Sequence, residues 1–259
     1  MALRPNRMYF SSSEYTKRIK ISTRCFVNEV RATFEGLDPP MHSTERRWFE
    51  EHPQFKHLFH MPKGNNHKVM GMWMLLLRTP EIEKRNEVWF IVNNVPIRYG
   101  LREHALISGL DCRNYPLDYK EWGNLDFVKQ HFGKTPVTLK AVKEKLATMG
   151  LVPDRKKMMV LYFLSSVICA QTKSGKGAKP VDEIFQRAVT KLSHCKTFPW
   201  GRYSYDNMLK EIFHTLDHFG GTVPETEKVK LWPIPGFCLP LEVSKNDRYF
   251  NFLLLKLTK

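Results

Sequence analysis

The side chain best placed for chemistry is Cys112, which lies in the stretch GLDCRN. A nucleophilic thiol needs a neighbouring histidine and a lowered pKa, and acyl transfer also needs donors for the oxyanion. No upstream glutamine is placed to build an oxyanion hole. The pattern therefore favours a structural cysteine at the end of a helix over a catalytic one.

Two pairs of histidines have spacings that put both rings on one helix face, His57 with His60 and His214 with His218. Neither pair lies in an H-E-x-x-H motif and no third ligand is evident, so no metal site is predicted. The stretch KSGKGAKP lacks the G-x-x-x-x-G-K-[ST] spacing of a phosphate-binding loop. We expect a solvated basic loop there, with no cofactor and no small-molecule substrate.

The net charge of the 259-residue chain is +15, with a pI near 9.6. Such a surplus favours an acidic partner such as DNA or RNA, although solubility explains it equally well. The candidate phosphate contacts are Lys17, Arg18, Lys20, Arg24, Lys173, Lys176 and Lys179.

The five cysteines form no C-x-x-C motif, which is typical of a protein from a reducing compartment. The N-terminal sequence MALRPNRMYF has no apolar core of a signal peptide. The longest apolar stretch, residues 158–170, falls short of the roughly 20 residues that cross a bilayer. We expect a soluble intracellular protein without a membrane partner, and a buried helix at 158–170.

The stretch EVWFIVNNVPIRYG, residues 87–100, predicts a β-hairpin. Asparagine tolerates positive φ, so Asn93-Asn94 suits a two-residue type I′ turn. The turn places six apolar residues on one face in the pairs Val92–Val95, Phe90–Ile97 and Val88–Tyr99. Pro96 lacks an N–H, which predicts that the second strand is an edge strand.

Helical periodicity predicts that most of the other segments are α-helices. One helix should start at Gly100 and end near Gly109, with the inner face Leu101, Ala105, Leu106 and Leu110. The basic residues 17–24 are either a solvated arm or the edge of the first helix. The expected fold class is α+β: a predominantly α-helical single domain with a small β-hairpin or sheet around residues 87–99.

Three segments resemble, in order, a plant-specific domain of unknown function found in Mutator-like transposon proteins. They are EVWFIVNNVPIRYGLREHALISGLDCRNYP, FPWGRYSYDNMLKEI and IPGFCLPLEV. The matching residues are Trp89, Phe90, Pro96, Ile97, Arg98, Leu101, Arg102, Glu103, Gly109, Leu110, Cys112, Pro199, Trp200, Gly201, Arg202, Gly236 and Phe237. Three ordered blocks are more specific than one motif. The chain departs from the pattern at Gly100, often serine in the family, and at His104, often phenylalanine.

The resemblance implies a division into a basic N-terminal arm with the first helix (1–39), the transposon-associated domain (40–240) and a divergent tail (241–259). In many members the domain precedes a ubiquitin-like (SUMO-type) cysteine protease domain, which has no counterpart here. The family has no assigned activity and supplies no catalytic residues. It implies a transposon-derived accessory module in the nucleus.

We therefore hypothesise a non-enzymatic interaction domain that binds a protein partner. The candidate contacts are Trp89, Arg98, Trp200 and Arg202. The first alternative is a sequence-nonspecific nucleic-acid-binding module that uses the basic residues above. The second is the remnant of a SUMO-type cysteine protease protein without its catalytic half.

Overall fold

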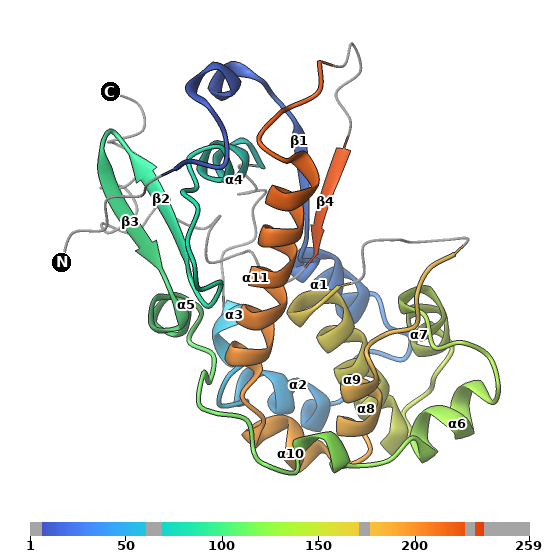
Figure 1. Ribbon diagram of the computed structural model, residues 1–259. Helices are drawn as coiled ribbons and strands as arrows, with labels where there is room; N and C mark the ends of the chain where they lie inside the picture. Colours follow the sequence, from blue (N-terminus) through green and yellow to red (C-terminus); the bar gives the residue numbers. More distant parts are fainter. Residues whose placement is uncertain (1–6, 61–68, 171–176, 226–230, 236–259) are drawn as a thin grey trace.

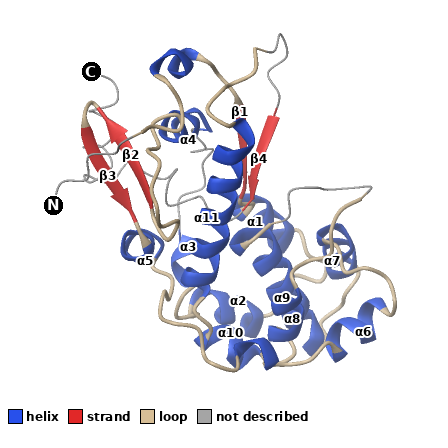
Figure 2. Ribbon diagram, in the orientation of Figure 1, coloured by secondary structure: helices blue, strands red, loops and turns tan. Residues whose placement is uncertain are grey.

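Helices form most of the computed structural model, which describes residues 7–60, 69–170, 177–225 and 231–235 (Figure 1). Two small two-stranded sheets accompany them (Figure 2). The α-helices are α1 Val27–Glu35, α2 Ser43–Glu50, α3 Lys56–His60, α4 Val69–Leu76, α5 Leu101–Ser108, α6 Asp126–Phe132, α7 Leu139–Ala147, α8 Pro153–Phe163, α9 Glu183–Ala188, α10 Leu192–Thr197 and α11 Trp200–Phe219, with 3-10 turns at Ser12–Thr16 and Tyr119–Glu121. The expected α-helical single domain with a small hairpin is confirmed.

The predicted hairpin is formed by β2 (Val88–Val92) and β3 (Val95–Tyr99). All three predicted apolar pairs occur, and Asn93 and Asn94 have φ values of 50° and 62°. Pro96 lies on β3, which pairs only with β2 in the described sheet, so the edge-strand prediction is confirmed. The period-2 pattern fixed this register because a slip by one residue would expose the apolar face.

The basic N-terminal segment is neither a solvated arm nor the edge of a helix. Residues Lys20–Arg24 form β1, which pairs in parallel with β4, Leu231–Pro235. Ile21 and Ile234 are both buried in this small sheet. Local periodicity could not predict the strand because its pairing partner lies some two hundred residues away in the chain.

The apolar stretch 158–170 is buried, as predicted. α8 continues into a π-helical turn at Leu164–Ile168. The first turn of α8 is fixed by the buried Arg155, whose Nη2 lies 2.6 Å from Glu45 Oε2. Within the described segments, no helix combines the length and the apolarity needed to cross a membrane.

α11 runs through the middle of the molecule and joins two hydrophobic clusters (Figure 1). Trp200, its first residue, belongs to the cluster around α8, which also takes in side chains of α1, α2, α6, α7, α9 and α10. From Tyr205 onward, α11 packs into the cluster formed by α4, the hairpin and the β1–β4 sheet. A single helix therefore connects the two halves of the fold.

Candidate functional site

Cys112 is not an activated nucleophile. Burial, together with the neighbouring Asp111 carboxylate, raises the pKa of its thiol to about 12. The thiol stays protonated at neutral pH, whereas nucleophilic attack needs the thiolate. Its sulfur packs against the first turn of α11, close to Gly201. The structural role expected from the sequence agrees with this environment.

Two buried histidines serve the core. Burial lowers the pKa of His104 to about 3, and that of His52 to about 3 as well. The His104 ring lies between Tyr99 Oη at 2.9 Å and Ser204 Oγ at 3.0 Å. Because the Ser204 hydroxyl donates to the carbonyl of Gly201, it accepts from Nε2 of His104. The ring is therefore neutral, and it links β3, α5 and α11.

The histidine pairs form no metal site in the described part of the chain. His57, His214 and His218 are exposed, and the side chain of His60 lies outside the described residues. Those residues contain no group of three or more His, Cys, Asp or Glu side chains that could hold a metal ion.

The end of the first motif block packs directly onto the start of the second. The carbonyl of Asp111 accepts hydrogen bonds from the backbone N–H groups of Gly201 at 2.8 Å and Arg202 at 3.2 Å. These N–H groups belong to the first turn of α11, where backbone N–H groups have no acceptor within the helix. A Cβ on Gly201 would lie 2.5 Å from Cys112 Sγ and 2.8 Å from the Asp111 carbonyl oxygen. Only glycine fits this contact.

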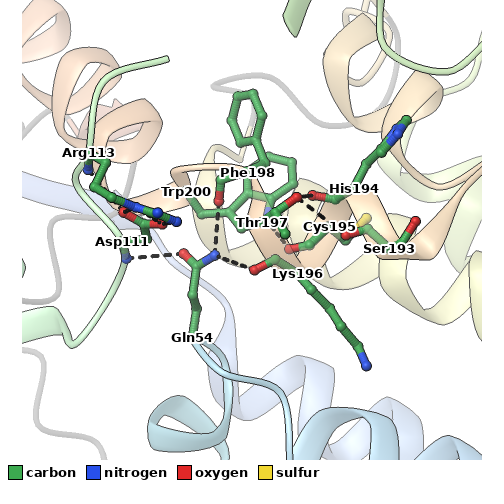
Figure 3. A network of polar contacts seen from close by, with 10 residues as sticks. All are labelled: Gln54, Asp111, Arg113, Ser193, His194, Cys195, Lys196, Thr197, Phe198 and Trp200. Atoms are coloured by element: carbon green, nitrogen blue, oxygen red, sulfur yellow. Dashed lines mark hydrogen bonds and ion pairs between the residues drawn. The ribbon is translucent and has the colours of Figure 1, made fainter. Parts of the chain in front are cut away.

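Gln54 completes this junction from the α2–α3 connection (Figure 3). Its Oε1 accepts from the Asp111 N–H at 3.1 Å. Its Nε2 donates to the carbonyls of Lys196, at 3.2 Å, and Phe198, at 2.9 Å. No local pattern in the sequence singles out Gln54, which nevertheless lies beside the cysteine segment. Its amide donor is directed to two carbonyls, so it is not an oxyanion donor in this structure.

The two candidates from the second motif block hold the fold together. Trp200 was expected on an interaction surface, but its indole is fully buried and donates from Nε1 to the Cys195 carbonyl at 2.7 Å. It cannot reach a partner in this structure. Arg202 is half-buried, donates to Asn114 Oδ1 at 3.1 Å and lies over the ring of Tyr115.

The other two candidates lie opposite each other on the outer side of the hairpin. Trp89 on β2 pairs with Arg98 on β3. Glu87 joins them, since its carboxylate accepts from Trp89 Nε1 at 2.8 Å and lies 3.6 Å from Arg98 Nη1. Arg98 also contacts Glu103 of α5 at 3.2 Å. These contacts hold a half-buried indole and a half-exposed guanidinium in place at the surface.

The orientation of α5 differs from the predicted one. Leu106 was placed on the inner face, yet it is 75% exposed, and Ile107 is 39% exposed. The inner face instead carries His104 and Ser108. The buried hydrogen bonds of His104 to β3 and α11 fix this rotation, which hydrophobic periodicity alone could not show.

Leu106 and Ile107 adjoin the hairpin surface. They lie three and four residues after Glu103, so they are its neighbours on the helix. We group them with the outward residues of the hairpin, which Arg98 connects to α5 through Glu103, and term this set the hairpin–α5 face: Trp89, Ile91, Pro96, Arg98, Leu106 and Ile107. An aromatic side chain, an arginine and exposed aliphatic groups are the composition enriched in protein interfaces.

Three of the basic candidates, Lys17, Arg18 and Lys179, have side chains within the described residues. Lys17 Nζ is held by Glu14 and the Val223 carbonyl, each at 3.0 Å, and so has a structural role. Arg18 and Lys179 are exposed. Lys20 and Arg24 lie on β1, but their side chains are not described. Lys173 and Lys176 lie outside the described residues.

Comparison with known proteins agrees with the motif blocks. A sequence model of the family described as "Domain of unknown function (DUF1985)" matches residues 76–211. This range contains the first block, the second block up to Glu211, and the junction between Asp111 and Gly201, whereas the third block lies outside it. The chain belongs to this family.

A relative is an uncharacterized protein of Arabidopsis thaliana, which is 32% identical over 206 residues. The match covers 79% of this chain and 25% of the relative, so the chain spans about a quarter of that protein's length. No solved structure is significantly similar to the chain.

Proposed function

We propose that this chain is a non-enzymatic interaction domain of a transposon-derived nuclear protein, and that it binds a protein partner through the hairpin–α5 face. The observation that carries the proposal is the exposure of Leu106 and Ile107 beside Trp89 and Arg98. The side chains of Trp89 and Arg98 are held in place by a hydrogen bond to Glu87 and an ion pair with Glu103, but they are not buried. Ordered aromatic and arginine side chains are favoured anchors in protein interfaces because little entropy is lost on binding.

The reactive candidates are used internally: Cys112 is a protonated thiol against α11, and His104 is a neutral buried ring. The resemblance to proteins encoded by Mutator-like transposons supports the nuclear and accessory parts of the proposal. Cleavage of a ubiquitin-like fusion protein by the purified chain would contradict it.

The test compares the partners of two double variants of the full chain expressed in plant cells. L106E/I107E places charge in the hairpin–α5 face, whereas L151E/V152E changes two residues that are 54% and 48% exposed in the α7–α8 connection. We expect quantitative proximity labelling to lose a defined set of proteins with the first variant and to keep it with the second. The proposal fails if both variants label the same proteins as the unmodified chain.

A further inference from the structure

We propose that exposed lysines around the start of α7 form a second binding surface, which contacts the phosphates of nucleic acid. We term this the α7 lysine surface: Lys134, Lys140 and Lys179. Its assembly depends on one long-range backbone contact, because the Val181 N–H donates to the Val137 carbonyl at 2.7 Å. Each of the three lysines lies within three positions in the sequence of Val137 or Val181, the two residues that this hydrogen bond joins.

The acidic groups nearby leave the positive charge of this surface largely uncompensated. The carboxylate of Asp182 caps α9 through the Ile184 N–H and accepts the Tyr203 hydroxyl, so it is directed into the fold. Glu144 lies 3.6 Å from Lys140, but both side chains are well exposed, at 66% and 73%. Exposed pairs of this kind contribute little and are easily exchanged for a phosphate.

α7 is held firmly enough to present these lysines in a fixed arrangement. Thr138 Oγ1 accepts from the Ala141 N–H and caps the helix. Val142 and Leu146 are fully buried, and Lys143 Nζ lies 2.7 Å from Glu29 of α1. A preorganised charged surface loses less entropy on binding than a flexible one.

The composition of the surface favours nucleic acid over an acidic protein. Nucleic-acid interfaces are more polar and more positively charged than protein interfaces, and lysines act there as point charges for phosphate. The exposed large apolar residues nearest in the described sequence, Leu151 and Val152, lie beyond the end of α7. In Figure 1, α7 and the hairpin are on opposite sides of the molecule, so the two proposed surfaces are separate.

The experiment measures binding of a fluorescent mixed-sequence DNA duplex to the full chain by anisotropy, over a series of salt concentrations. The variant K134Q/K140Q/K179Q removes the α7 lysine surface. The control K84Q/R102Q/K210Q removes the same charge from exposed residues near the hairpin and on α11. Each lost phosphate contact should lower the slope of log affinity against log salt by about 0.9.

We expect the α7 variant to lose at least about tenfold in affinity near 0.1 M salt, with a slope lower by roughly 2.7, and the control to lose much less. Both variants should keep the wild-type melting temperature, because all six positions are exposed. The proposal is overturned if the chain does not bind duplex at low salt, or if both variants weaken binding equally. It is also overturned if polyglutamate displaces the duplex at equal charge concentration, since the partner would then be an acidic polypeptide.

Discussion

The two ends of the segment 87–112 differ in what they contact. The last residues, from Leu110 to Cys112, pack against α11, and both backbone groups of Asp111 are paired, with α11 and with Gln54. The first residues form a hairpin whose outer side shows Trp89 and Arg98 to solvent. Both ends contribute to the same family resemblance, yet only one of them is explained by packing.

This difference separates the motif residues that the fold requires from those that it leaves at the surface. Gly201 leaves no room for a larger side chain where α11 meets Leu110, Asp111 and Cys112, and Trp200 is fully buried. Their presence implies nothing about binding. Trp89 and Leu106 have no comparable internal requirement for their exposed surface, so they are the better candidates for function.

The largest effect is expected for Gly201→Ala at the enclosed end. The added Cβ would lie 2.5 Å from Cys112 Sγ, 2.8 Å from the Asp111 oxygen and 2.9 Å from Leu110 Cβ. We expect the free energy of unfolding to fall by about 3 kcal/mol, measured by urea denaturation. Gly150→Ala is the control, because nothing lies within 4 Å of its Cβ position. Equal stability of the two variants would refute the close-packing explanation.

A smaller loss is expected for Gln54→Leu. The substitution leaves the Asp111 N–H and two carbonyls without their partner, and should cost about 2–3 kcal/mol in urea denaturation. Gln130→Leu is the matched control, since Gln130 is exposed on α6. If Gln54→Leu matched this control, Gln54 would not be the residue that fixes the junction.

The pH dependence of stability tests the buried link between the two ends. The pKa of His104 is about 3 in the folded state, against about 6.5 when unfolded. Between these values only the unfolded state takes up the proton, so stability falls as pH falls, by up to about 1.4 kcal/mol per pH unit. His104→Phe should reduce that slope, whereas His214→Gln, at an exposed position, should not. His52, whose pKa is also about 3, contributes a similar pH dependence of stability to the unmodified protein and to both variants, so it does not affect the comparison.

The smallest effect on stability is expected at the exposed end. Leu106→Ser should change the free energy of unfolding by less than about 0.5 kcal/mol, because Leu106 is 75% exposed. Leu110→Ser, four residues later and 4% exposed, should be clearly destabilising. Thermal unfolding of the two variants compares them directly. A large loss with Leu106→Ser would show that this residue belongs to the core.

Local patterns predicted the elements whose partners are close in sequence. The hairpin register, the α5 limits at Gly100 and Gly109, and the burial of residues 158–170 were all correct. The inner face of α5 was predicted wrongly at Leu106, because hydrophobic periodicity could not show that Tyr99 and Ser204 satisfy the ring of His104 inside the core. Gln54 had no local signal, since its three hydrogen bonds go to distant segments.

The sequence by itself determined the fold class and the hairpin, because alternating apolar residues, turn asparagines and helix-ending glycines act over a few residues. It also carries the family resemblance, through its motif blocks. Tertiary structure alone decided the pairing of β1 with β4, the burial of Trp200 and the outward position of Leu106. These depend on contacts between segments far apart in the chain. Whether a side chain belongs to the core or to a binding surface is set by what packs against it.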